Sequence, residues 1–231
     1  MTNFNIKVVS DAICPWCYLG TKRLERAISL YKQDIPGGAN DTFTITYFPF
    51  YLDPTLPKTP VDSKAYLAKK IGADRMAMAH ARLKTLGEAE GICFSLNGKL
   101  GNTRDAHRLV QLAKTKSNET QNRVMAALFK SYFEEDADIT SQATLLAAGE
   151  KAGLDKSEVK QWLDDGKGGD EVDSEVEQAY RDGVRGVPNF TINGQYEISG
   201  AQDAEKFLEE FLRVKRSSPD AGVKSSEGLS C

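Results

Sequence analysis

The sequence predicts an α/β fold in which a mixed sheet with flanking helices is interrupted by a large all-helical insert. A short apolar strand and a helix open the chain, and the middle shows almost only helical periodicity. A hairpin and an amphipathic helix then close it. With 231 residues, 40% of them hydrophobic, the chain can bury a substantial core as one large domain or as a small domain carrying an insertion.

Residues 1–58 hold the first elements of the sheet. Residues 6–10 have the pattern of a short buried strand, and apolar residues then recur at helical spacing until Pro36. Residues 43–47 alternate apolar and polar side chains, as a second strand does. Because a strand–helix–strand order implies a right-handed crossover, we expect the two strands to be parallel.

Residues 59–176 are predicted to form the inserted helical domain. Glycines divide this segment into five or six helices, and no convincing strand occurs between Asp62 and about Gly183. Asn118 and Asp155, each followed three residues later by Gln or Glu, are the predicted N-caps of two of these helices.

Residues 177–216 are predicted to complete the sheet. Strand character returns at 187–192, Asn193-Gly194 is a strong two-residue hairpin signal, and an amphipathic helix follows Asp203. Residues 217–231 are small, polar and aperiodic, which predicts a disordered tail. This order is that of a thioredoxin fold with a helical domain inserted in its middle. We expect the insert to hang over the end of the sheet where the first helix begins.

Charge and composition exclude several kinds of partner. The chain carries 30 basic and 33 acidic residues, and no basic cluster alternates with aromatics as a nucleic-acid groove requires. The N-terminus lacks the pattern of a signal peptide, and no stretch approaches the ~20 apolar residues of a membrane span. Four cysteines are far fewer than a disulfide scaffold needs. We therefore expect a protein of the cytoplasm or a similar reducing compartment, with no nucleic-acid or membrane partner.

The stretch SDAICPWCYLG, residues 10–20, places Cys14 and Cys17 three positions apart. A disulfide that closes so short a loop restricts the unfolded chain very little, so a structural bridge is not expected. A zinc site needs four ligands, and the remaining candidates are scattered and unpaired. These are Cys93, Cys231, His80 and His107. We therefore expect no metal.

Electron exchange explains the position of the two cysteines. Cys14 is placed at the start of a helix, where unpaired backbone N–H groups and the helix dipole favour a thiolate. Pro15 suits the first helical turn because it has no N–H to leave unpaired. Cys17 lies about one turn further on, close enough to attack a mixed disulfide on Cys14, and we expect it to be more buried and to stay protonated until then.

The sequence resembles the DsbA-like thioredoxin superfamily, and most closely its FrnE-like branch. The motifs that carry the resemblance occur in order along nearly the whole folded chain. They are DAICPWC at 11–17, NTRDAH at 102–107, GVP at 186–188 and ISGA at 198–201.

The resemblance implies a thiol-disulfide oxidoreductase with catalytic Cys14 and Cys17. It also implies that Pro188 is a cis-proline beside Cys14 that keeps metal from the dithiol, and that Val187 turns its backbone towards the substrate. Pro15 and Trp16 join Val187 as expected substrate contacts. His107 is a further candidate for substrate binding, although a hydrogen-bonded packing role is the commoner one for such a histidine.

Two positions depart from the wider family. Thioredoxin and DsbA proper carry a buried acid six positions before the first cysteine, where this chain has Val8. Asp11 is then the nearest acid, and it either relays the Cys17 proton or serves as a turn residue ahead of the helix. Trp16 replaces a histidine whose charge would stabilise the thiolate. We therefore expect a reduction potential between those of DsbA, about −120 mV, and thioredoxin, about −270 mV.

The expected substrates are protein or small-molecule thiols and disulfides, with glutathione or a thioredoxin system as redox partner and no cofactor. A glutathione-dependent transferase or isomerase of the kappa-class or 2-hydroxychromene-2-carboxylate isomerase type is the first alternative, although such relatives usually have serine at the position of Cys14. A non-enzymatic peptide-binding module is the second. Cys93 is expected to be a buried small side chain, and Cys231 an exposed thiol.

Overall fold

The computed structural model describes residues 1–217, and its main sheet has the predicted mixed topology. Its strands are β2 (Thr42–Pro49), β1 (Asn3–Ser10), β5 (Asn189–Ile192) and β6 (Tyr196–Ser199), in that order across the sheet. β1 and β2 are parallel, whereas β5 is antiparallel to both β1 and β6. The predicted parallel pair and hairpin are therefore confirmed, and the two ends of the chain meet in one sheet.

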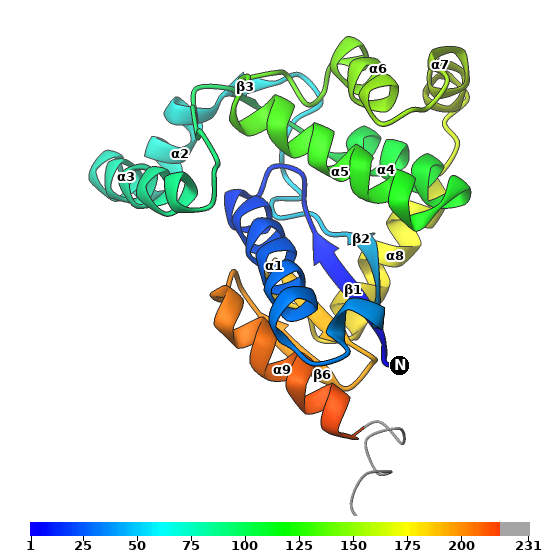
Figure 1. Cartoon of the computed structure of the whole chain (residues 1–231). Helices are drawn as coiled ribbons and strands as arrows, with labels where there is room; N and C mark the ends of the chain where they lie inside the picture. Colours follow the sequence, from blue (N-terminus) through cyan, green and yellow to red (C-terminus); the bar gives the residue numbers. More distant parts are fainter. Residues whose placement is uncertain (218–231) are drawn as a thin grey trace, which may run out of the picture.

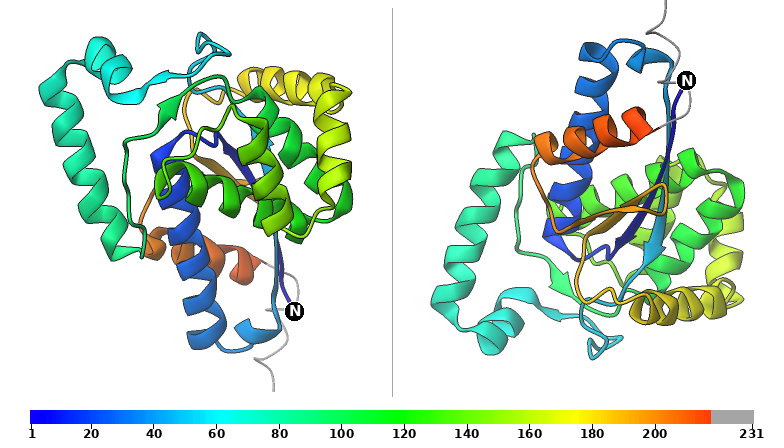
Figure 2. Two further views of the ribbon diagram at one scale, coloured as in Figure 1. Left: turned by 90° about the horizontal axis from the view of Figure 1, so that it is seen from above. Right: turned by 90° about the horizontal axis from the view of Figure 1, so that it is seen from below.

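Helices cover both faces of this sheet (Figure 1). α1 (Pro15–Asp34) and α9 (Ala204–Ser217) pack together on one face, and α8 (Gly169–Arg181) lies on the other, as the view from below in Figure 2 shows. The Phe4 ring of β1 is buried, with ring centroids 5.3 Å from Tyr31 of α1 and 5.2 Å from Phe211 of α9. Edge-to-face aromatic packing of this kind adds to the burial of apolar area and fixes both helices on the sheet. A 3₁₀ turn, η1 (Gly38–Asn40), leads from α1 to β2.

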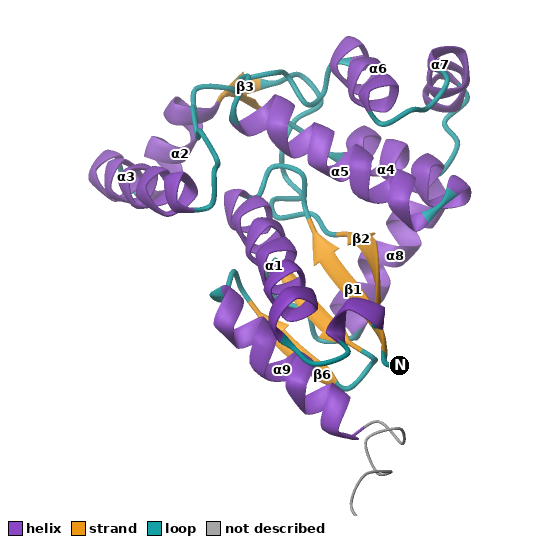
Figure 3. Ribbon diagram, viewed as in Figure 1, coloured by secondary structure: helices purple, strands orange, loops and turns teal. Residues whose placement is uncertain are grey.

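Seven helices form the region between β2 and β5 in the described structure, one more than the upper number predicted. In chain order they are α2 (Ser63–Ile71), α3 (Ala73–Ala89), α4 (Arg104–Lys116), α5 (Asn118–Phe133), α6 (Gln142–Lys151), α7 (Lys156–Asp164) and α8. α4 and α5 cross the end of the sheet where β1 stops, as expected, and α2 and α3 form a pair set to one side (Figure 3). The Gln121 side chain joins α5 to the sheet, because it binds both the N–H and the carbonyl of Tyr47 at 2.9 Å.

Two short strands lie in the region that was predicted to contain none. β3 (Val61–Asp62) and β4 (Lys99–Leu100) pair antiparallel, with Val61 opposite Leu100. Two residues are too few to produce the alternation by which a strand is recognised in a sequence.

One of the two predicted helix caps is confirmed and the other is wrong. The Asp155 carboxylate accepts from the backbone N–H of Glu158 at 2.9 Å, as predicted. For α5 the cap is Ser117, which accepts from the Thr120 N–H at 3.0 Å, while the Asn118 side chain donates to the Ile45 carbonyl of β2. Ser and Asn are equally good caps, so a contact from β2 decides between them.

The predicted domain limits need two changes. The boundary between residues 176 and 177 falls inside α8, because one continuous helix leads from the insert back to the sheet. Ser217, predicted to begin the tail, is the last residue of α9, and the rest of the predicted tail, with Cys231, lies outside the described residues. Among residues 1–217, no helix has the length and apolar character needed to cross a membrane.

Candidate active site

The two cysteines lie where β1 passes into α1. Cys14 is the N-cap residue of α1 in an extended conformation (φ −90°, ψ 110°), and Pro15 is the first helical residue. The backbone N–H of Cys14 donates to the Asp11 carbonyl at 3.0 Å, and that of Cys17 donates to the Cys14 carbonyl at 3.0 Å. No side chain caps this end of the helix, so the helix dipole acts directly on Cys14.

Neither cysteine forms a disulfide and both are buried, but only one of them is accessible from a pocket. Cys14 is 2% exposed and lines a pocket, whereas Cys17 is fully buried and does not line it. The Cys14 thiol also donates to the Val187 carbonyl, with 3.6 Å between sulfur and oxygen. Cys14 is therefore accessible from the pocket, whereas Cys17 is not.

The environment of Cys17 keeps its thiol protonated. Burial raises the pKa of the Cys17 thiol well above its ordinary value, and the neighbouring Cys14 raises it further. The Ser10 hydroxyl and the Asp11 backbone act in the opposite direction but do not outweigh burial. This agrees with the expectation that Cys17 holds its proton until a mixed disulfide forms.

The Val187–Pro188 peptide bond is cis, as predicted. Gly20 of α1 lies against this loop, and sequence reasoning did not single it out. A Cβ atom on Gly20 would come within 3.0 Å of Pro188 Cγ and 3.1 Å of the Phe190 ring. Any larger residue at position 20 would therefore press on the loop that borders Cys14. In the sequence, only the position of this glycine, three residues after Cys17, could have indicated that it lies near the site.

His107 does not line the pocket, so the described structure gives no support to its predicted substrate contact. It is only 3% exposed, and its Nε2 lies 3.1 Å from the Phe50 carbonyl oxygen and 3.3 Å from Asp11 Oδ1. Both neighbours are acceptors, which requires the proton on Nε2. α4 directs His107 inward against the loop after β2, which agrees with the alternative packing role.

Asp11 is held by the turn ahead of α1 and by the loop after β2. Its carboxylate accepts from the Leu52 N–H at 2.8 Å and from the Ile13 N–H at 3.5 Å, besides its contact with His107. These bonds agree with the turn-residue role, and none of them involves Cys17. The proton-relay role of Asp11 therefore has no supporting contact in the described structure.

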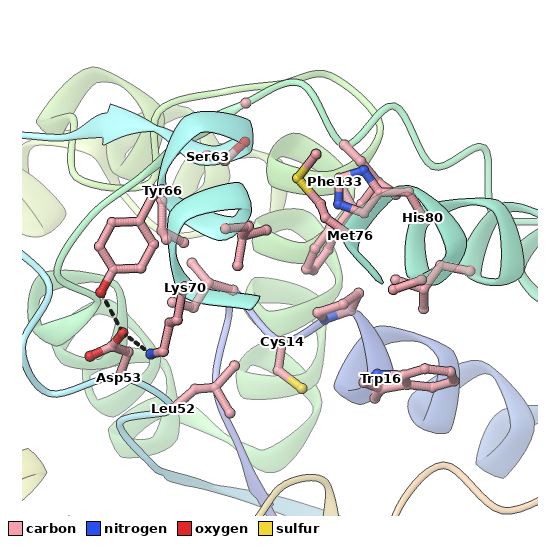
Figure 4. Close-up of a pocket in the computed structure, with 18 of the residues that line it drawn as sticks. Cys14, Trp16, Leu52, Asp53, Ser63, Tyr66, Lys70, Met76, His80 and Phe133 are labelled. Atoms are coloured by element: carbon pink, nitrogen blue, oxygen red, sulfur yellow. Dashed lines mark hydrogen bonds and ion pairs between the residues drawn. The ribbon is translucent and has the colours of Figure 1, made fainter. Parts of the chain in front are cut away.

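A pocket of about 350 Å³ separates the start of α1 from the α2–α3 pair (Figure 4). The predicted substrate contacts Pro15, Trp16 and Val187 all line it, together with Cys14. Most of the remaining wall is apolar and includes Ile13, Leu56, Leu67, Leu83, Leu96 and Phe133. The Arg82 guanidinium of α3 lies 5.7 Å from the centre of the Trp16 ring, within the range of a cation–π contact.

A polar cluster in this wall was missed at the level of sequence. Asp53 Oδ2 accepts from the Tyr66 hydroxyl at 2.7 Å and binds Lys70 Nζ, as the dashed lines in Figure 4 show. Burial alone would raise the pKa of the Asp53 carboxyl, but hydrogen bonds from Lys70, Thr55 and Tyr66 outweigh it and hold the pKa well below its usual range. Asp53 is thus charged and paired. Tyr66 and Lys70 lie on a separate helix, α2, so no short motif could reveal the cluster.

Cys93 is exposed, so the prediction that it is buried is wrong. Ile92 and Phe94 on either side are buried, and the alternation leaves the cysteine pointing outward. Within the described chain, no group of three His, Cys, Asp or Glu side chains is arranged to hold a metal ion.

Comparison with known proteins agrees with this architecture. The family model of the DSBA-like thioredoxin domain matches residues 5–212. A probable DsbA oxidoreductase from Streptomyces coelicolor, SCO1869, is similar in structure with a TM-score of 0.82 and 27% identity, over 98% of this chain and 94% of that one.

Two more distant structures share the fold. A 2-hydroxychromene-2-carboxylate isomerase has a TM-score of 0.68 and 18% identity, over 96% of this chain and 100% of its own. The cytosolic disulfide reductase DsbM from Pseudomonas aeruginosa, solved with glutathione, has a TM-score of 0.56 and 18% identity, over 90% of this chain and 99% of its own. With the mixed sheet, the helical insert and the family match together, the chain belongs to the DSBA-like thioredoxin domain family.

Proposed function

We propose that this protein is a thiol-disulfide oxidoreductase that acts through Cys14 and Cys17. The observation that carries the proposal is the difference between the two thiols. Cys14 begins a helix and lines a pocket, while Cys17 lies one turn further on, fully buried and with a raised thiol pKa. An exposed structural disulfide or a metal site would need no such difference.

The exchange proceeds in two steps that balance without a cofactor. The Cys14 thiolate attacks one sulfur of a substrate disulfide, which forms a mixed disulfide and releases the other half as a thiolate. Cys17 then gives up its proton and attacks the Cys14 sulfur, which releases the second substrate thiol and leaves a Cys14–Cys17 disulfide. Two electrons pass to the substrate, and the oxidised protein runs the same steps in reverse.

The partners follow from this chemistry. Protein or small-molecule disulfides are the proposed substrates, with Pro15, Trp16 and Val187 as contacts next to Cys14. Glutathione or a thioredoxin system would restore the dithiol, and DsbM, whose structure holds glutathione, supports glutathione as the first to test. We propose a reducing compartment such as the cytoplasm as the working location, in line with the sparse cysteines.

Equilibration against graded ratios of reduced and oxidised glutathione tests the function. Trp16 lies beside Cys14 and supplies a fluorescence signal, and mass spectrometry identifies the titrating pair. We expect one reversible two-electron transition with a midpoint between about −270 and −120 mV. A protein in which Cys14 and Cys17 never form a disulfide would contradict the proposal.

A glutathione-dependent isomerase or transferase is the second candidate. The likeness to 2-hydroxychromene-2-carboxylate isomerase favours it, together with the apolar pocket at the start of α1. Such an enzyme needs no resolving thiol, so Cys17→Ser would leave it active. Loss of turnover in Cys17→Ser with disulfide substrates would favour the oxidoreductase.

A further inference from the structure

Lys70 has an unused binding capacity in the wall of the pocket. Its Nζ binds one carboxylate of the described structure, that of Asp53, and its side chain is 51% exposed. An ammonium group has three N–H donors, and besides the bond to Asp53 the Lys70 Nζ lies 5.7 Å from the centre of the Tyr66 ring, which leaves at least one donor for a ligand. Asp53 Oδ1 is occupied by Thr55 and Oδ2 by Tyr66 and Lys70, so this carboxylate positions the lysine and offers little to a ligand of its own.

The surroundings of Lys70 favour a negative ligand. Residues 63–89, which hold the α2–α3 pair, contain six basic and two acidic residues and stay net positive when Asp53 is counted with them, whereas the whole chain has a net charge of −3. His80 also lines the pocket, and burial lowers the pKa of its imidazole, with Lys64 and Lys84 lowering it further. His80 therefore stays neutral at pH 7 and leaves Lys70 as the charged donor at this wall.

The rest of the pocket favours an apolar ligand of small size. Its volume of about 350 Å³ lies at the lower end of the range of roughly 300–1,000 Å³ for small-molecule sites. Leu67 and Ile71 lie near Lys70 on α2 and line the pocket, as do Leu83 and Phe133. A polar ligand would leave its hydrogen-bonding groups unpaired against these side chains.

We propose that the pocket selects small disulfides, and the thiols derived from them, that combine an apolar body with a carboxylate. Lys70 is the specificity residue that binds the carboxylate while the apolar body fills the pocket and its sulfur meets Cys14. This inference rests on the proposed oxidoreductase function and names its substrate class. The chemistry is the exchange given above: the disulfide gains two electrons from Cys14 and Cys17 and leaves as two thiols.

Two aromatic disulfides, one negatively charged and one neutral, provide the test. Dithiobis(nitrobenzoate) carries a carboxylate on each ring, and dithiodipyridine is neutral at pH 7. Each is mixed with pre-reduced protein in a stopped-flow instrument, and the absorbance of the released aromatic thiol gives the rate and the half-saturating concentration. The proteins are wild type, Lys70→Gln, Lys70→Arg and the matched control Lys69→Gln, which changes the exposed neighbour outside the pocket.

We expect Lys70→Gln to raise the half-saturating concentration of the carboxylated disulfide about tenfold, the usual effect of losing one charge-assisted hydrogen bond. The neutral disulfide should change less than about twofold. Lys70→Arg should restore the wild-type value, and Lys69→Gln should behave as wild type.

Three results would overturn the inference: equal losses with both disulfides, no loss with either, or the same loss in Lys69→Gln. If wild-type protein oxidises Cys14 and Cys17 with both disulfides while the variants show no selective loss, only the substrate class is wrong. If neither disulfide oxidises the pair in wild type, the proposed function itself fails.

Discussion

At the scale of single residues, the proposed mechanism depends on Cys17 as the thiol that releases the product. Cys17→Ser keeps the volume of the site but cannot attack a mixed disulfide. We expect the variant treated with oxidised glutathione to carry one glutathione on Cys14, whereas wild type passes to the Cys14–Cys17 disulfide. Peptide mass mapping identifies both species and separates glutathione on Cys14 from glutathione on the exposed Cys93. Cys93→Ser, at an exposed position, is the control and should behave as wild type. A variant that stays unmodified would exclude Cys14 as the attacking thiol.

The size of the residue at position 20 is constrained by Pro188 and Phe190, beside the candidate active site. A methyl group in Gly20→Ala would meet Pro188 and Phe190 at close to 3 Å, so the loop must shift or the helix must move away. We expect a loss of about 1–3 kcal/mol in the free energy of unfolding, typical of overpacking a buried site. Urea denaturation measures it. In Gly186→Ala, two residues before Pro188, the new methyl group meets open space and should change stability little. Equal effects in the two variants would disprove the packing argument.

The sequence was informative at residues whose role follows from neighbours in the chain. Cys14, Pro15 and Cys17 lie within one helical turn, so their arrangement could be derived. The Asp53–Lys70 pair is different, because a loop and a helix bring together residues that are 17 positions apart. The predicted substrate contact of His107 found no support for a related reason. The sequence places it on a helix, but only tertiary packing decides which way that helix turns.

At the scale of elements, α3 is fastened to α1 by a buried carboxylate at its C-terminal end. Glu90, whose side chain is 5% exposed, accepts from Arg23 Nε at 3.2 Å and from Arg26 Nε and Nη2 at 3.0 and 2.9 Å. The Arg23 side chain is itself nearly buried and also donates to the Ala201 carbonyl. Removing the charge from Glu90 therefore weakens the bonds to both guanidinium groups in a nearly buried position, although Arg23 keeps Asp203 and Arg26 keeps Glu205 as carboxylate partners.

We expect Glu90→Gln to lower the free energy of unfolding by about 1–3 kcal/mol, less than for a fully buried pair because Arg26 is partly exposed. Glu88→Gln changes the same charge two residues earlier at an exposed position and should cost little. Urea unfolding of both variants gives the comparison. A loss as large in Glu88→Gln would mean that net charge, and not the contact with α1, is responsible.

At the scale of the whole molecule, the order of elements fixed the topology before any contact was known. A strand–helix–strand start and a hairpin–helix end leave few ways to complete one sheet, and both ends do pair with each other through β1 and β5. The path of the inserted helices was harder to predict from the sequence. Its helices are recognisable one by one, but the contacts that turn α2 and α3 towards Cys14 are spread over many residues and have no periodic signal.

The Cys17 thiol also links the redox state of the protein to the pH dependence of its free energy of unfolding. Its pKa is raised in the folded protein, chiefly by burial, so the folded state keeps a proton that an unfolded thiol loses near pH 8.5. The stabilising effect is complete below that pH and is lost as pH rises. The free energy of unfolding of the reduced protein should therefore fall above about pH 8.5, by up to about 1.4 kcal/mol per pH unit from this group.

Urea unfolding of reduced protein between about pH 7.5 and 9 measures this slope where unfolded tyrosines are still mostly protonated. Cys17→Ala should show a shallower slope, and so should the oxidised wild type, in which Cys17 has no proton to lose. The comparison is between slopes, so any cavity created by the substitution shifts the curve without changing the conclusion. Parallel slopes in all three proteins would show that Cys17 ionises equally in the folded and unfolded states. Its burial would then not hold the proton that the resolving step must release.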